Sequence, residues 1–403
     1  MAARSSPYGH SDISCPRAAV TVVFLLNGFV LAVWAARVPE VAARLHLHPA
    51  TLSAALLALA VGALVAFQLS AALTARAGSA ISTRAFAVLF CLGLIGPSLA
   101  RTLPELVAAL TVFGAGNGGL DIAMNAQGLH IERRAGRPVL SSLHAAFSAG
   151  GLAGAGFGAL AAAIHLSTGT EFATVAAAAT VAALAATHAL LPDRPGPDRH
   201  PARQPLLRLP GRALLALGII AFCSAIGEGS MGDWSALYLR DDLATTPTLA
   251  ALGYAAFSLG MLAGRLAGDH LRRHHPPATL ITTGGLLAGA GLSTGLLLHH
   301  PDTVIAGYLT VGLGLSVVAP LVFAAVNHQH HQPRSDALAA VATLGYAGFL
   351  TGPPLIGLLG HQTSLTTSLL LVAALCATAG ITARPTRLLH PNTTTQPNTQ
   401  PPT

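Results

Sequence analysis

Long apolar stretches recur along the chain and are separated by short segments rich in Arg, Pro and His. An α-helix rises 1.5 Å per residue, so about 20 apolar residues cross the hydrocarbon core of a bilayer. The pattern predicts an all-α integral membrane protein with 12 transmembrane helices. The predicted spans are residues 18–36, 50–73, 82–100, 104–128, 141–165, 171–191, 212–239, 247–268, 278–298, 303–326, 337–359 and 364–383.

Polar segments divide these spans into two groups of six. A Pro- and Arg-rich segment in the middle of the chain, which no continuous helix can cross, predicts a linker. The C-terminal segment is polar and rich in Pro and Thr, so we expect it to be disordered. The predicted organisation is a polar lead at 1–17, a six-helix bundle at 18–191, a linker at 192–212, a second six-helix bundle at 213–383 and a tail at 384–403.

Glycines of the two groups match at one constant offset of 198 residues. A single offset that holds through several spans indicates an internal repeat of six helices. We therefore expect two pseudo-symmetric bundles with a binding site at their interface, the arrangement that parallel repeats give in transporters. The matched pairs are Gly62 with Gly260, Gly114 with Gly312, Gly116 with Gly314, Gly150 with Gly348, and Gly154 with Gly352.

Composition supports the membrane class and excludes a soluble enzyme. Only 9% of residues are charged, against about 25% in soluble domains, and the mean hydropathy is +0.61. The four cysteines show no metal-binding or redox spacing, and we expect neither a metal nor a cofactor.

The net charge of +7 comes with 22 basic residues, all of them Arg. They are dispersed between the spans, so we do not expect nucleic acid as a partner. With the N-terminus inside, all but four of the arginines fall on the inner side. The outer four are Arg37, Arg44, Arg101 and Arg240. Because inner loops carry the excess of positive charge, both termini and the linker are expected in the cytoplasm.

A polar stripe interrupts the fourth span, within Phe113–Arg134. Residues four apart on a helix share one face, so Asn117, Asp121 and Asn125 form a single polar face. A carboxylate at bilayer depth costs about 2.5–3.5 kcal/mol on insertion scales, so it must face protein or water. Asp121 is therefore the leading candidate for a functional residue.

The internal repeat offers a test of this interpretation. At the offset of 198 the three positions of the stripe map to Leu315, Ala319 and Phe323 in the second half. A polar face that served folding alone would be expected in both halves. Its presence in only one half favours a role in function.

Other polar residues inside spans are weaker candidates, and each has a structural alternative. Glu228 in span 7 either faces a central cavity or pairs with an Arg. Asn27 in span 1 either binds substrate or bonds to a neighbouring helix, and His144 either titrates near neutral pH or packs between helices. Asp233, near the outer end of span 7, is a further candidate.

Tyr254 and Tyr346 have hydroxyl groups that can form hydrogen bonds with a substrate.

Two motifs are misleading. GAGNGG, Gly114 to Gly119, matches a dinucleotide-binding pattern, but its flanks are membrane spans and lack the required strand and ribose-binding acid. The histidine runs NHQHHQ and HLRRHHPP lie in predicted loops and are interpreted as solvated. Without a nucleophile–base pair or a Walker sequence, we expect no enzyme activity.

Twelve spans in two repeats, a central linker and short basic loops after spans 2 and 8 resemble the major facilitator superfamily. The segment GMLAGRLAGDHLRR after span 8 is similar to the gating loop of that family. The segment SAALTARAGSAISTR after span 2 is a degraded copy, in which Ala75 stands where the family has Asp. The gate residues that the resemblance implies are Arg76, Gly78, Arg265, Asp269, Arg272 and Arg273.

The run G-x-G-x-x-G-x-D-x-x-x-N-x-Q in span 4, followed by SSLHAAFSAGG, resembles a bacterial branch of that family, loosely akin to fucose–proton symporters. Those symporters carry acids in spans 1 and 4. Asp121 matches the second acid, whereas span 1 offers only Asn27, so a two-acid scheme is not implied.

The resemblance and the polar stripe together predict a secondary active transporter of a small solute. It would work by alternating access and be coupled to protons, which Asp121 would carry. The alternative is a proton-coupled efflux pump for drugs or secondary metabolites, although an aromatic content of 5% favours a defined polar substrate. A receptor or membrane scaffold without substrate flux is a different class. We expect a small molecule, protons and the lipid bilayer as partners of a monomer.

Overall fold

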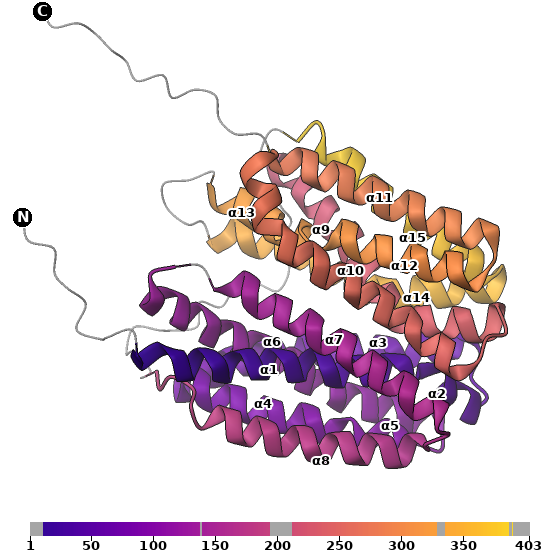
Figure 1. The fold of residues 1–403 in the computed structure, drawn as a ribbon, viewed down its shortest axis with the longest axis horizontal. Helices are drawn as coiled ribbons and strands as arrows, with labels where there is room; N and C mark the ends of the chain where they lie inside the picture. Colours follow the sequence, from indigo (N-terminus) through magenta and orange to yellow (C-terminus); the bar gives the residue numbers. More distant parts are fainter. Residues whose placement is uncertain (1–10, 138, 194–211, 329–334, 387–388, 390–403) are drawn as a thin grey trace, which may run out of the picture.

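A computed structural model of the protein describes residues 11–137, 139–193, 212–328, 335–386 and 389, and the regular elements there are all helices. They form two bundles lying side by side (Figure 1). The first bundle contains α1 (Ser11–Ala36), α2 (Val38–Arg44), α3 (Pro49–Ala77), α4 (Ser79–Gly93), α5 (Ile95–Leu99), α6 (Leu103–Ala135), α7 (Leu140–Ala163) and α8 (Thr168–Thr187). The second contains α9 (Arg212–Leu237), the π-helical turn η1 (Tyr238–Asp242), α10 (Pro247–His274), α11 (Pro277–Leu298), α12 (Pro301–Leu315), α13 (Val318–His328), α14 (Ser335–Gln362) and α15 (Leu365–Ala383).

The fold class predicted from the sequence is confirmed. In the described part of the chain, 12 helical segments are long and apolar enough to cross a membrane. Three of these spans are each built from two helical elements, α4 with α5, α9 with η1, and α12 with α13. The fourth span is longer than predicted and runs from Leu103 to Ala135, because the helix continues through the polar residues that follow residue 128.

Helix starts follow simple local rules. Proline occupies one of the first two positions of α3, α6, α10, α11 and α12, where its missing N–H leaves no helical hydrogen bond unmade. Four helices are capped by a hydroxyl that accepts a bond from the backbone N–H three residues later. These caps are Thr102, Ser167, Thr246 and Ser364.

The repeat is visible in equivalent helix contacts within the two bundles. A Cβ added to Gly114 in α6 would collide with the backbone oxygen of Leu59 in α3. A Cβ on Gly312, its repeat partner in α12, would collide with the backbone oxygen of Phe257 in α10. Leu59 and Phe257 are themselves 198 residues apart. The matched glycines therefore mark the places where paired helix backbones touch, as expected of helices packed in lipid.

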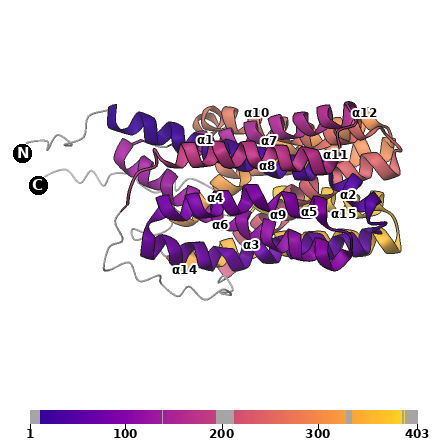
Figure 2. The same cartoon turned by 90° about the horizontal axis from the view of Figure 1, so that it is seen from below.

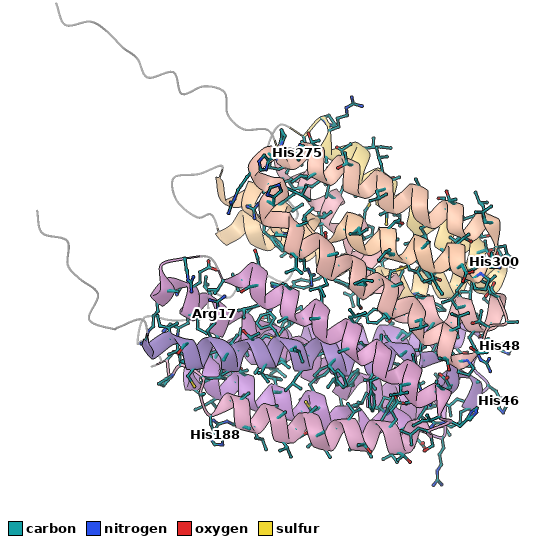
Figure 3. All side chains as sticks on the ribbon, viewed as in Figure 1. Arg17, His46, His48, His188, His275 and His300 are labelled. Carbon is teal, nitrogen blue, oxygen red and sulfur yellow. The ribbon has the colours of Figure 1, made fainter. Side chains whose placement is uncertain are left out.

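Polar side chains gather at the two ends of the bundles. Figure 3 places Arg17, His188 and His275 near the end that carries both chain termini, and His48 and His300 at the opposite end. Figure 2, seen from below, shows the long helices running between these ends. The apolar middle of the molecule is the part that fits the hydrocarbon core of a bilayer.

The two bundles meet mainly along two helix pairs, α7 with α10 and α3 with α14. Small residues permit the approach, because a Cβ on Gly357 of α14 would collide with the side chain of Ser53 in α3. Near the middle, the rings of Phe67 and Tyr346 join the same two helices at a centroid distance of 4.6 Å. The contact between the bundles is thus divided into two seams with the central helix faces between them.

The segment after span 2 differs from the expected loop. Gly78 alone separates α3 from α4, with a φ of +90° that L side chains rarely adopt. Asp193, far along the chain, caps the start of α4. Its carboxylate accepts hydrogen bonds from the Ser79 backbone N–H at 2.7 Å and from the Ser79 hydroxyl at 2.8 Å.

The charge of Asp193 is stabilised by this cap. Burial acts to raise the pKa of Asp193, but the hydrogen bonds from Ser79 and the backbone of Ala80 outweigh it and hold the pKa below its usual range. The junction after span 2 therefore gains an acid from the segment predicted as the linker. Gln127 of α6 joins the same junction, because its Nε2 donates to the Ser79 hydroxyl at 2.8 Å and to the Leu191 carbonyl at 2.9 Å.

Replacing Gly114 by Ala should destabilise the first bundle by about 1–3 kcal/mol, because the new methyl group has no room against α3. Gly156→Ala is the matched control, since a Cβ there has no heavy atom within 4 Å and the residue is exposed. Thermal unfolding of the purified variants in detergent measures the difference. Equal melting temperatures for the two variants would contradict the close-packing interpretation.

Replacing Asp193 by Asn should lower stability by about 1 kcal/mol at neutral pH, because the helix start loses a charged cap. The folded pKa is lowered, so the contribution of the carboxylate is full above the unfolded pKa of about 3.9 and is lost as the pH falls through the folded value. Melting temperatures of wild type and variant should therefore converge only in strong acid. Asp302→Asn, at the start of α12 with a side chain 83% exposed, is the control and should change little.

Candidate functional site

A cavity of about 350 Å³ lies between the two bundles. Its walls come from α1, α3, α6 and α7 of the first bundle and from α9, α10 and α14 of the second. Five of the six cavity residues predicted from the sequence line it. These are Asn27, Asn117, Asp121, His144 and Glu228.

Asn125, the sixth, does not line the cavity and instead holds Asp121 in place. Its Nδ2 donates to the Asp121 carboxylate oxygen Oδ1 at 3.1 Å and to the Asp121 backbone carbonyl at 2.8 Å. The spacing of four residues that suggested a common face also brings these two side chains together. Tyr346 of the second bundle lies within electrostatic reach of Asp121.

The two remaining asparagines of the cavity have capacity for further hydrogen bonds. Asn117 lines the cavity and makes no hydrogen bond with the described residues. Asn27 is 2% exposed, and its one bond runs from Nδ2 to the Met124 sulfur at 3.8 Å. A thioether is a weak acceptor, so the Asn27 carbonyl oxygen is left to the cavity.

Arg265 lies in the cavity wall, although the family resemblance placed it in a gating loop. The reason is that α10 continues as a helix to His274, so Arg265 sits inside the span. Its Nη1 donates to the His144 backbone carbonyl at 3.0 Å and to the Ser148 hydroxyl, both on α7 of the other bundle. Arg265 therefore connects the two bundles directly.

Glu228 is the acid that balances this arginine. It lies within electrostatic reach of Arg265, without a direct ion pair inside 4 Å among the described residues. It accepts a hydrogen bond from the Ser224 hydroxyl one helical turn away at 3.3 Å. Glu228 thus lines the cavity and lies near Arg265 without pairing with it directly.

Asp233 and Tyr254 complete the polar lining on the side of the second bundle. Asp233 makes no hydrogen bond or ion pair with the described residues, and Tyr254 is the hydroxyl within its electrostatic reach. From the sequence, Asp233 is a weaker candidate for a functional residue because it lies near the outer end of its span. The helix face that α9 turns to the cavity decides its position, and that face is set by packing.

Aromatic rings are concentrated around the cavity. The whole chain contains 20 aromatic residues, 13 Phe, 5 Tyr and 2 Trp. The seven that line the cavity are Trp34, Phe67, Phe147, Tyr254, Phe257, Tyr346 and Phe349. The low overall aromatic content, which favoured a polar substrate at the level of sequence, therefore does not describe the lining of the site.

The remaining residues of the expected gate lie away from the cavity. Arg76 is exposed at the end of α3, and Gly78 forms the junction with α4. Arg272 and Arg273 are exposed in the last turn of α10. The side chain of Asp269 lies outside the described residues.

A buried ion pair fastens the first bundle at the end opposite the termini. Arg37 Nε lies 3.0 Å from Glu171 Oε2, and Glu171 is fully buried. Arg37 also donates to the Leu166 carbonyl at 2.7 Å. Burial raises the pKa of nearby Glu40 above its usual range, against the opposing effects of Arg37 and of Arg240 in the second bundle.

Relatives of known sequence agree with this architecture. A family model described as Major Facilitator Superfamily matches residues 18–346 and 217–402. The chain is 34% identical over 368 residues to y4wD of Sinorhizobium fredii, named as an uncharacterized transporter, covering 91% of this chain and 97% of the relative. It is 31% identical over 357 residues to the membrane protein MosC of Rhizobium meliloti, covering 88% and 86%.

Solved structures show the same fold at low sequence identity. A D-xylose–proton symporter superposes with a TM-score of 0.72 at 18% identity, covering 94% of this chain and 98% of that one. The nucleoside transporter NupG superposes with a TM-score of 0.72 at 11% identity, covering 91% and 98%. The chain therefore belongs to the Major Facilitator Superfamily and is a multi-pass membrane transporter, not an enzyme.

Proposed function

We propose that the protein moves a small solute across the bacterial cell membrane by alternating access, with coupling to protons through Asp121. The observation that carries the proposal is the position of Asp121 on the wall of a cavity between the two bundles. A carboxylate at this depth is costly to maintain without a functional reason. One structural neighbour is a proton symporter, which supports protons as the coupling ion.

The mechanism divides between rigid parts and breakable contacts. Glycine contacts hold α3 to α6 and α10 to α12, so each bundle moves as one body. Rocking the bundles about the cavity would expose it to one side of the membrane and then to the other. The Arg265 bonds to α7 join opposite bundles, so they are contacts that must break when the seam between α7 and α10 opens.

A change in the protonation of Asp121 would affect both bundles. It belongs to α6 of the first bundle and lies near Tyr346 on α14 of the second. The bond from Asn125 favours the ionised carboxylate, whereas the apolar cavity wall favours the neutral acid. When the bundles expose Asp121 first to one side of the membrane and then to the other, Asp121 would take up a proton on one side and release it on the other.

The proposal also covers the orientation of the protein in the membrane, the direction of transport and the kinship within the family. Both termini and the linker are placed in the cytoplasm by the positive-inside rule, and the protein is proposed to act as a monomer. Kinship with fucose–proton symporters stays a prediction. Efflux is the alternative direction, and the aromatic residues around the cavity favour it.

Replacing Asp121 by Asn should abolish the response of the bundles to pH. Spin labels at His188→Cys and His275→Cys, on exposed positions of different bundles near the termini (Figure 3), report the separation of the bundles. Cys15→Ser removes the exposed native cysteine, and the other three are buried. The distance distribution should shift between mildly acidic and mildly alkaline buffer in the parent protein and stay fixed in Asp121→Asn.

Asp302→Asn, which removes an exposed acid far from the cavity, is the control and should keep the shift. Retention of the full pH response in Asp121→Asn would contradict the role of Asp121 in coupling. Melting curves of the variants exclude a trivial loss of folding.

Cys15 tests the orientation, because it is the exposed cysteine of the described chain and lies near the N-terminal end of α1. A membrane-impermeant maleimide should label Cys15 in inverted vesicles and not in intact spheroplasts. The matched control is Cys15→Ser with His300→Cys, which moves the thiol to the opposite end (Figure 3) and should reverse the pattern. Labelling of Cys15 in intact spheroplasts would place the termini outside.

A further inference from the structure

The charges around the cavity do not balance. Among the described residues, three carboxylates line it, those of Asp121, Glu228 and Asp233, against a single guanidinium, that of Arg265. His144 is the other titratable nitrogen of the lining, and its ring packs edge-on against Phe24 at a centroid distance of 5.3 Å. The cavity therefore has an excess of acidic groups over basic ones.

The one guanidinium is already engaged. Arg265 donates to the His144 carbonyl and the Ser148 hydroxyl, and the carboxylate of Glu228 lies within electrostatic reach of its charge. Asp121 is held by Asn125 and is assigned to proton coupling in the proposal above. Asp233 is left with no hydrogen-bonding or charged partner among the described residues.

A carboxylate without a partner in an apolar wall is unfavourable, and a cation in the cavity would relieve this cost. The surroundings of Asp233 suit an organic cation. Trp34, Tyr254 and Phe349 line the same cavity, and aromatic faces attract ammonium groups by cation–π interaction.

Asn27 gives an independent observation that points the same way. It is 2% exposed, its Nδ2 is turned to the Met124 sulfur, and its carbonyl oxygen has no partner among the described residues. This oxygen is a hydrogen-bond acceptor that no donor of the described residues reaches. A ligand rich in N–H donors would satisfy both Asn27 and Asp233.

We propose that the transported solute is a small organic cation with a protonated amine, and that Asp233 is its counter-ion. The inference rests on the proposed transport function and adds the substrate class. The ammonium group would donate to Asp233, and the apolar part of the solute would lie against the rings. A cavity of about 350 Å³ is at the small end of ligand pockets, which favours a compact amine over a bulky drug.

Other substrate classes fit less well. An anion would have to compete with Glu228 for Arg265 and would meet two further carboxylates. A neutral sugar would leave the charge of Asp233 without compensation. The two acids thereby take separate tasks on separate bundles, with Asp121 of α6 for the proton and Asp233 of α9 for the solute.

The test measures ligand binding to the purified full-length protein in detergent by thermal shift and by calorimetry. The probes are three amines (benzylamine, ethanolamine and putrescine), with benzyl alcohol and benzoate as uncharged and anionic analogues of the first. At least one amine should raise the melting temperature, since a ligand that binds only the folded state stabilises it. Benzyl alcohol and benzoate should not.

Asp233→Asn should weaken binding of that amine by about tenfold or more, equivalent to about 1.4 kcal/mol. Asp233→Glu keeps the charge and should retain most of the affinity. Asp241→Asn, which removes an exposed acid a short distance along the chain and outside the cavity, is the control and should bind as wild type. Melting curves without ligand show that the variants are folded.

The outcomes separate the substrate class from the coupling mechanism. No stabilisation by any of the three amines, equal binding of benzyl alcohol, or unchanged affinity in Asp233→Asn would overturn the cation proposal. If the bundle separation still responds to pH through Asp121, the proton-coupling proposal survives that failure. Conversely, amine binding that depends on Asp233 would support the substrate class even if Asp121→Asn kept its pH response.

Discussion

The rest of the structure depends on the contact of helix backbones at glycines inside each bundle. Gly114 against Leu59 and Gly312 against Phe257 bring paired helices closer than any side chain would allow. In lipid, where apolar surfaces gain nothing from leaving water, such packing is a main source of helix association. It makes each bundle a stiff unit and leaves the interface between the bundles as the place where movement is least costly.

Stiff bundles also decide where polar groups are tolerated. Within a bundle, a buried charge needs a fixed partner, as Arg37 has in Glu171 and as the start of α4 has in Asp193. Between the bundles, partners can be exchanged. Arg265 spans the seam to α7, and Glu228 lies within reach of it without a direct ion pair. Charges that stabilise the fold and charges that are available to a solute are therefore separated by location.

The two bundles contribute different acids to the cavity. The first bundle contributes Asp121 with its partner Asn125, and the second contributes Asp233, which has no partner among the described residues. A shared cavity lets two carboxylates on different rigid bodies be occupied together or in turn. In the proposed mechanism, occupancy at one of these acids would affect the energy of the movement that exposes the other.

The sequence by itself determined the 12 spans, the two-bundle repeat and the candidacy of Asp121, since each rests on local apolar periodicity or on a constant offset. Tertiary structure alone decided which polar residues meet. Asp193 caps the start of α4, Arg265 joins the cavity wall, and aromatic rings gather around the cavity. These features depend on contacts between residues more than one hundred positions apart and on which face each helix turns inward. Backbone packing at the glycines fixes those faces, and no local pattern encodes it.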